Sequence, residues 1–255
     1  MKVVLIGSGN VATHLGPELQ RAGHDIAQVY SRKYSNAEVL AEKLGSSAID
    51  DLKVVDTGAE IYLIMVSDDA IQEIADKMPR VSGLVAHTAG AVSAEPLRSI
   101  SEDHGVLWTP QTFSKGRVPE LKNAPFCVEA SNARSLELLR NLAGCISSDV
   151  REVTGKQRKA AHLAAVIGSN FSNFMYTLAA QVLAKEDMDL SVIAPLLKET
   201  LNKALDIGPE IGQTGPARRG DRKVIEEHLK QLADDPELEQ IYEELSSAII
   251  RHYAG

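Results

Sequence analysis

The sequence predicts an α/β protein in two parts, an N-terminal doubly wound and mostly parallel sheet followed by an all-helical C-terminal domain. In residues 1–151 short apolar runs alternate with amphipathic stretches, a pattern typical of parallel strands because these need helical crossovers. From Thr154 onward the hydrophobic period is that of helices, and no strand pattern recurs. The 255 residues suffice for both parts, which we place at residues 1–151 and 152–255.

The first dozen residues have the pattern of a nucleotide-binding strand, turn and helix. An apolar run at residues 3–6 is followed by a Gly-x-Gly-x-x-Ala turn, and an amphipathic stretch then continues to residue 22. Gly7 permits the tight turn, Gly9 lets the backbone approach a pyrophosphate, and Ala12 lets the helix pack closely on the strand. The turn that we expect to bind a dinucleotide consists of Gly7, Ser8, Gly9, Asn10, Val11 and Ala12.

The end of the second predicted strand favours NADP over NAD. An NAD site has an acidic residue here that holds the ribose 2′-hydroxyl, whereas this chain has Ser31, Arg32 and Lys33 after residues 26–30. A hydroxyl and two cations suit a 2′-phosphate, and the missing acid also disfavours S-adenosylmethionine. The alternative, in which Arg32 and Lys33 are only solvated loop charges, stays open.

Polar residues also follow the later predicted strands. The carboxyl ends of parallel strands meet at one edge of a sheet, where cofactors bind. We expect cofactor contacts there from Val66, Ser67, His87 and Thr88, and substrate contacts from Gln111 and Thr112. His87 has two interpretations, a proton donor beside the cofactor or a buried structural histidine with satisfied hydrogen bonds.

The helical half begins with a long predicted helix. Thr154 and Gln157 have the spacing of a capping box, and the helix runs to about Lys185, interrupted only by Gly168. Its length is about 45 Å at 1.5 Å per residue. Apolar residues surround much of its axis, so we expect it to be buried on several sides, at the centre of a bundle or of a dimer.

Polar residues form a stripe on this helix. At 100° per residue His162, Ser169 and Asn173 fall within roughly 20° of one line, and Asn170 lies about 80° from His162. A polar stripe on a buried helix costs free energy unless it is hydrogen-bonded or faces water. The stripe therefore indicates either a wet cleft or a satisfied interior network.

The segment at residues 212–221 has no periodicity. It contains Gln213 and Thr214, then Arg218 and Arg219 between glycines, and it ends at Asp221. A guanidinium can hold a carboxylate or phosphate through two hydrogen bonds, so an anion clamp is one interpretation. The other is a solvated loop in which Asp221 caps the next helix.

Composition excludes several classes of function. The formal charge of −8 and the pI near 5.4 disfavour binding to nucleic acid or to an anionic membrane. Cys127 and Cys145 are too few for a metal cluster or a disulfide framework, and we expect no metal. The sequence has no long apolar run that could span a membrane and no basic leader, so we expect a cytoplasmic protein.

With these motifs in hand, the chain resembles a family of Rossmann-like proteins whose C-terminal helical half is a domain of unknown function. The most specific matching motifs are the run from His162 to Asn173 and the run from Gln213 to Ala217. Broader relatives are pyrroline-5-carboxylate reductase, the deazaflavin-dependent NADP reductases and the 6-phosphogluconate dehydrogenase C-terminal-like group. The resemblance implies a nicotinamide cofactor and a helical domain that dimerises and closes the active site.

One departure limits this resemblance. Hydroxyacid members of the wider group use a lysine with an asparagine four residues later, early in the long helix. Here Lys156 is followed by Ala160, and Lys159 by Leu163. Their alcohol chemistry therefore cannot be transferred to this chain.

The resulting expectation is a homodimeric NADP-dependent oxidoreductase that acts on a small polar, anionic substrate with a C=O or C=N bond. His162 is the expected general acid, because histidine as a residue type exchanges protons near neutral pH. Asn170 and Asn173 would orient the reacting group, and Arg218 or Arg219 would hold a carboxylate. The further substrate-contact candidates are Ser169, Gln213 and Thr214. The alternatives are a non-catalytic NADP-binding sensor or scaffold and, third, a methyltransferase.

Overall fold

The computed structural model describes residues 1–114, 116–117 and 119–254. The chain divides into two compact units, residues 1–168 and residues 169–255. The predicted division at residue 151 marks the change from strands to helices, whereas the two units are defined by the contacts between residues. The first helix after the sheet therefore belongs to the first unit.

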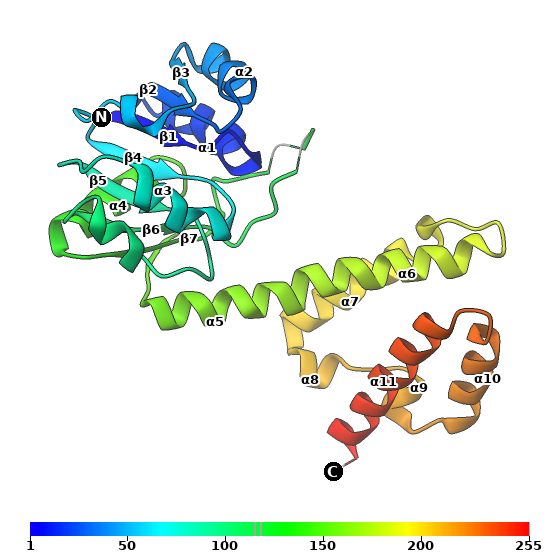
Figure 1. Ribbon diagram of the computed structural model, residues 1–255. Coiled ribbons are helices and arrows are strands. Elements are labelled where there is room, and N and C mark those ends of the chain that lie inside the picture. Colours follow the sequence, from blue (N-terminus) through cyan, green and yellow to red (C-terminus); the bar gives the residue numbers. More distant parts are fainter. Residues whose placement is uncertain (115, 118, 255) are drawn as a thin grey trace. The chain divides into compact units, whose positions relative to one another are not determined.

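In the described part of the first unit, eight strands form one sheet in the order β3-β2-β1-β4-β5-β6-β7-β8 (Figure 1). The strands are β1 (Lys2–Ile6), β2 (Asp25–Tyr30), β3 (Ser47–Ile49), β4 (Ile61–Ile64), β5 (Leu84–His87), β6 (His104–Trp108), β7 (Phe126–Ala130) and β8 (Val150–Glu152). Strands β1 to β6 are parallel, whereas β7 is antiparallel to β6 and parallel to β8. The predicted doubly wound, mostly parallel sheet is therefore confirmed.

Both faces of the sheet are covered. Val3 and Leu5 of β1 pack in one apolar cluster with three helices, α1 (Asn10–Arg21), α2 (Tyr34–Leu44) and α4 (Ala133–Gly144). Val4 and Ile6 belong to a second cluster with α3 (Ile71–Lys77) and the short turns η1 (Leu52–Val54) and η3 (Glu95–Ser99). Since successive side chains of a strand point to opposite faces, these two clusters are the two cores of the sheet.

The long helix begins as predicted but is not an α-helix throughout. Thr154 and Gln157 form the capping box at the start of α5 (Gly155–Ala165). A π-helical segment η4 (Val166–Phe171) follows, and α6 (Ser172–Ala184) continues from it. The spacing of 100° per residue does not apply within η4, so the predicted line through His162, Ser169 and Asn173 lacks its geometric basis.

The second unit consists of α6 and further helices. They are η5 (Leu190–Val192), α7 (Ala194–Ile207), α8 (Pro209–Gly212), α9 (Pro216–Arg219), α10 (Arg222–Leu232) and α11 (Pro236–Tyr253). Asp221 caps α10 by accepting a hydrogen bond from the Val224 N–H, as one of the two sequence interpretations predicted. No helix of the described residues has the length and apolar composition that a membrane crossing requires.

The long helix is not buried in a bundle within the single chain, and the alternative, burial in a dimer, stays a prediction. None of the described residues of α6 is buried, and Leu163 on α5 is 61% exposed. Helix α7 carries Leu205 at 76% exposure. The exposed apolar residues on these helices include Ile167, Phe171, Phe174, Val182, Leu196 and Leu201. An apolar surface of this extent is typical of an interaction site.

Candidate functional site

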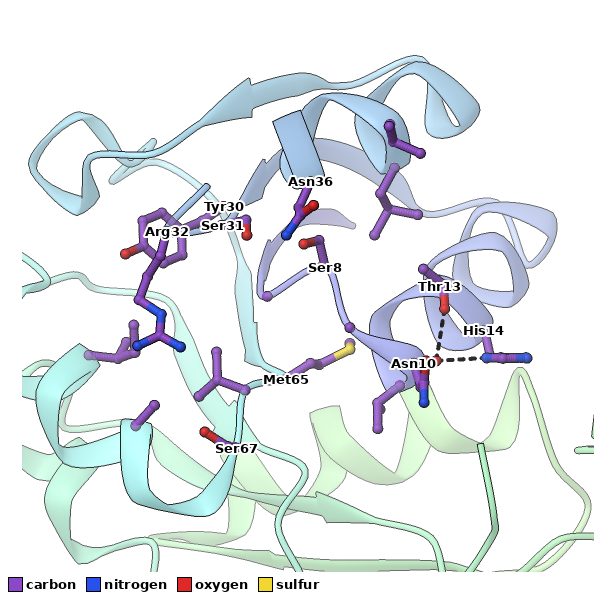
Figure 2. Close-up of a pocket in the computed structure, with 18 of the residues that line it drawn as sticks. Ser8, Asn10, Thr13, His14, Tyr30, Ser31, Arg32, Asn36, Met65 and Ser67 are labelled. Atoms are coloured by element: carbon purple, nitrogen blue, oxygen red, sulfur yellow. Dashed lines mark hydrogen bonds between the residues drawn. The ribbon is translucent and has the colours of Figure 1, made fainter. Parts of the chain in front are cut away.

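A cavity of about 990 Å³ lies at the carboxyl ends of β1, β2 and β4 (Figure 2). Strands β1 and β4 are neighbours in the sheet, and the chain winds outward from them in opposite directions. This point is the topological switch of an open α/β sheet, where ligands bind. The residues predicted to contact a cofactor that line the cavity are Gly7, Ser8, Gly9, Asn10, Val11, Ser31, Arg32, Val66 and Ser67.

The glycines of the first turn differ in their surroundings. Gly7 has φ of +128°, and a Cβ there would collide with the carbonyl oxygen of Met65. At Gly9 a Cβ would meet nothing within 4 Å. Because Gly9 lines the cavity, a side chain there would occupy cavity space beside the turn. Ala12 is fully buried in the core below. The turn therefore leaves its backbone open to a ligand at Gly9.

The start of α1 suits an anion. Gly9 is the N-cap residue and supplies no side-chain hydrogen bond to the first turn of the helix. The N–H groups of that turn have no partner within an α-helix, and the helix dipole adds positive potential there. These donors and the open space at Gly9 fit a pyrophosphate group.

Positively charged side chains also line the cavity. Arg32 follows β2 and lines the cavity together with Lys43 of α2 and Lys77 of α3 (Figure 2 shows Arg32). Glu73 also lines it, and it accepts a hydrogen bond from Lys77 Nζ at 2.6 Å. This hydrogen bond lowers the pKa of Glu73. Sequence reasoning missed Lys43 and Lys77, because which helix residues face the cavity is decided by the fold.

The segment after β6 reaches α1 on the cavity side. Asn10 Nδ2 donates to the Phe113 carbonyl at 3.0 Å, and His14 Nε2 lies 3.0 Å from the Arg117 carbonyl. His14 Nδ1 lies 2.6 Å from the carbonyl of Asn10 (Figure 2). The His14 ring packs against Phe113. Gln111 and Thr112 lie in this segment, but neither is among the described residues that line the cavity.

His162 lies at the carboxyl ends of β5 and β6. Its ring packs on Gly90, where a Cβ would lie 2.8 Å from His162 Cγ and 2.9 Å from Trp108 Cε2. The His162 and Trp108 ring centroids are 5.9 Å apart. The structure therefore brings His162 to the turn after β5, the segment that the sequence placed at the cofactor edge.

His87 is the structural histidine of the two interpretations. Its side chain is fully buried, its Nδ1 accepts a hydrogen bond from the Ala89 N–H at 3.1 Å, and its Nε2 lies 3.1 Å from the Ser93 carbonyl. Burial lowers the pKa of His87 to about 4, so the ring is neutral at pH 7. Neither His87 nor Thr88 is among the described residues that line the cavity, so cofactor contacts by these two residues stay a prediction.

The remaining candidates belong to the second unit. Ser169 and Asn170 lie in η4, and Asn173 lies in α6. Gln213 Nε2 donates to the Thr214 carbonyl at 3.1 Å in the connection before α9. Arg218 stacks on the Tyr253 ring at 4.5 Å. Arg218 is thus partly engaged within its own unit.

Two further findings bear on the chemistry. The described residues contain no group of three or more His, Cys, Asp or Glu side chains that could hold a metal ion. Sequence reasoning also missed Arg158 of α5, which is fully buried near the turn after β5. A buried arginine in a helix has the same sequence signature as an exposed one.

Two family models match the chain. A model described as a Rossmann-like domain matches residues 1–110, and one described as a domain of unknown function, DUF2520, matches residues 124–249. A curated glycerol-3-phosphate dehydrogenase [NAD(P)+] from Thermoanaerobacter sp. is 27% identical over 116 residues, which are 40% of this chain. The matched region is 35% of that relative, so this chain spans about a third of its length.

Solved structures resemble the chain over nearly its whole length. A proposed NADP oxidoreductase from Bacteroides fragilis is 39% identical, with 98% of both chains covered and a TM-score of 0.89. A protein from Thermotoga maritima is 22% identical over 99% of this chain and 98% of its own, with a TM-score of 0.72. A reductive aminase from Aspergillus terreus, in complex with NADPH and ethyl-5-oxohexanoate, is 13% identical over 98% and 94%, with a TM-score of 0.71. At these lower identities the second and third comparisons show a shared fold.

Proposed function

The chain belongs to the family of proteins in which a Rossmann-like domain precedes the domain of unknown function DUF2520, and on this premise we propose that it is an NADP-dependent oxidoreductase. The observation that carries the proposal is the cavity at the β1 and β4 switch point. It combines the open turn at Gly9 with Ser31 and Arg32 at the end of β2. The relative from Bacteroides fragilis, itself a proposed NADP oxidoreductase, supports the same choice of cofactor.

The cavity offers groups for the two phosphate-bearing parts of the cofactor. The backbone of Gly7 to Val11 would bind the pyrophosphate, and Ser31 and Arg32 would bind the 2′-phosphate, with Lys43 and Lys77 adding positive charge. Among the described residues that line the cavity, Glu73 is the sole carboxylate, and Lys77 already binds it. A bound nicotinamide would supply or accept the hydride.

The substrate proposed is a small polar, anionic molecule with a C=O or C=N bond. Structural relatives include pyrroline-5-carboxylate reductase from Streptococcus pyogenes and an imine reductase from Streptomyces aurantiacus, whose names indicate C=N chemistry. His162 would donate the proton, Asn170 and Asn173 would orient the reacting group, and Arg218 or Arg219 would hold a carboxylate. His162 has the best support of these, because it lies against the turn after β5.

We also propose that the active form is a homodimer through the helical unit. The apolar residues on α5, α6 and α7 are exposed in the single chain, and covering them would remove a large apolar area from water. A second copy of this chain is the partner that the resemblance stated in the sequence analysis implies.

Turnover tests the reaction. NADPH oxidation would be followed across a panel of cyclic imines and oxo acids, with His162→Ala as the variant and Arg140→Ala, an exposed residue of α4, as the control. We expect His162→Ala to lower turnover by roughly 10²-fold or more with NADPH binding intact, because a general acid contributes that much. An unchanged rate would remove His162 from the mechanism. NADPH binding without turnover of any substrate would instead favour the sensor or scaffold.

A further inference from the structure

Arg158 is a fully buried cation with a defined set of partners. Its Nη1 donates to the carbonyls of Ala89 at 3.0 Å and Gly90 at 2.7 Å, and its Nη2 binds Glu129 Oε1 at 2.9 Å. Ala89 and Gly90 belong to the turn after β5, whereas Glu129 belongs to β7. A single guanidinium on α5 therefore joins the helix to the turn after β5 and to strand β7.

The turn that Arg158 binds is fixed from its other side as well. The Thr88 N–H donates to the Ile64 carbonyl at 3.1 Å, and the Ala89 N–H donates to His87 Nδ1 at 3.1 Å. The Ala89 peptide group is thus held at its N–H by His87 and at its carbonyl by Arg158. The turn is therefore hydrogen-bonded to β4, to His87 and to Arg158.

His162 contacts the same turn. It follows Arg158 by four residues in α5, so the two side chains lie on the same face of the helix. Arg158 binds the Gly90 carbonyl, and the His162 ring packs on the α-carbon side of the same glycine and beside Trp108. Arg158 and His162 are therefore two consecutive contacts of α5 with one turn.

We propose that Arg158, paired with Glu129, is the positioning residue that fixes His162 against the turn after β5. The catalytic meaning of this assignment rests on the proposed function, whereas the positioning itself does not. Arginine suits the task because its planar group can bind two carbonyls and a carboxylate at once with fixed geometry. Lysine keeps the charge but offers a single ammonium group, which cannot reproduce that planar arrangement.

The protein contains a built-in reporter for this position. Trp108 is the sole tryptophan of the sequence, and its ring lies 5.9 Å from that of His162. A protonated imidazole beside an indole quenches its fluorescence, and histidine side chains exchange their proton between about pH 5 and 8. A pH titration of tryptophan emission therefore monitors the closeness of His162 and Trp108, and it requires neither nucleotide nor substrate.

The experiment measures the change in tryptophan emission between about pH 5 and 8, here called the emission step, for the wild type and four variants. His162→Gln identifies the part of the step that comes from His162. Arg158→Lys keeps a cation beside Glu129, so that the partly buried carboxylate is not left unpaired. Gly90→Ala displaces His162 directly, and Gly144→Ala, where a Cβ meets nothing within 4 Å, is its matched control.

We expect Arg158→Lys and Gly90→Ala to reduce the His162 part of the step at least twofold, and Gly144→Ala to leave it unchanged. Circular dichroism establishes that each variant is folded. A step of wild-type size in folded Arg158→Lys would overturn the proposal.

The kinetic arm uses whichever substrate the wild type reduces. Arg158→Lys is expected to lower kcat by about 10- to 100-fold, as for a misplacement of about 1 Å, with the KM for NADPH within about twofold. A reduced emission step with unchanged kcat would overturn the positioning role in catalysis. Absence of turnover in the wild type would count against the proposed function alone, because the emission test does not depend on turnover.

Discussion

Gly7 and Gly9 constrain the first turn for different reasons. Gly7→Ala places a Cβ against the Met65 carbonyl at a φ of +128°, which side chains rarely adopt. We expect a loss of stability on the order of 1–3 kcal/mol, measured by chemical denaturation. Gly9→Val has open space around its Cβ, so we expect normal stability but NADPH binding weakened by about tenfold or more, or about 1.4 kcal/mol.

Gly144→Ala again serves as the control for both variants, since a Cβ there contacts nothing within 4 Å. Equal losses of stability in Gly7→Ala and Gly9→Val would contradict the distinction between a steric and a ligand-facing glycine. Wild-type NADPH affinity in Gly9→Val would show that the ligand does not approach this turn.

His87 gives stability a pH dependence of known sign. Burial lowers its pKa from 6.5 to about 4, so the unfolded chain binds a proton more readily than the folded chain. The stability that depends on neutral His87 is complete above pH 6.5 and decreases as the pH falls toward 4. The shift corresponds to about 3 kcal/mol at most.

Denaturation curves between pH 7 and pH 4 measure this dependence. In His87→Gln we expect a flatter decrease over this range, although the variant starts from lower stability because a buried hydrogen-bonding group has been changed. His24, whose pKa is lowered by burial, contributes to the decrease that remains, and so do carboxyl groups with a lowered pKa such as Glu73 and Glu210. Parallel curves for the wild type and His87→Gln would rule out His87 as the source.

At the scale of the element, the start of α5 depends on its capping box. Thr154 Oγ1 accepts from the Gln157 N–H at 3.2 Å, and Gln157 Oε1 accepts from the Thr154 N–H at 2.9 Å. Thr154→Ala is expected to lower the free energy of unfolding by about 1 kcal/mol, measured by denaturation. Thr177→Ala is the control, because the Thr177 hydroxyl binds only a carbonyl of its own helix. Similar losses in the two variants would exclude a capping effect.

Elements that bury a regular apolar pattern were predictable from the sequence. The run at residues 61–66 corresponds to β4, where Ile61–Ile64 are all buried, and the predicted strand at residues 84–87 is β5. The π-helical segment at Val166–Phe171 was not predictable, because it differs from an α-helix in its backbone hydrogen bonds and not in composition. The turn between the first strand and the first helix was also predictable, because Gly7 and Gly9 stand in the Gly-x-Gly-x-x-Ala pattern.

Parts of the site that depend on tertiary contacts were not predictable. Lys77 joins the cavity because α3 lies beside the end of β2, and Arg158 is buried because α5 docks on the turn after β5. The sequence around Lys77 and Arg158 does not indicate either of these contacts. His87 was open to two interpretations for the same reason, since burial alone decides between them.

At the scale of the whole molecule, the exposed apolar surface of the helical unit makes a prediction about assembly. Leu205 is 76% exposed and Leu201 is 59% exposed, both on α7. If a second copy covers this surface, Leu201→Glu with Leu205→Glu places charge in the interface and shifts the protein to the monomer, since an unpaired buried charge is costly. Sedimentation velocity measures the state, with Arg140→Glu on α4 as the control. A monomeric wild type would contradict the proposed dimer.

The central claim is that the cavity at the switch point binds NADP, and calorimetry on nucleotide-free protein tests it most directly. Titrations would compare NADPH, NADH and S-adenosylmethionine for the wild type, for Arg32→Ala and for Arg21→Ala, an exposed residue of α1. The account predicts preferential binding of NADPH that weakens about tenfold or more in Arg32→Ala, about 1.4 kcal/mol, and is unchanged in Arg21→Ala. Equal binding of NADPH and NADH, or binding of none of the three ligands, would contradict it.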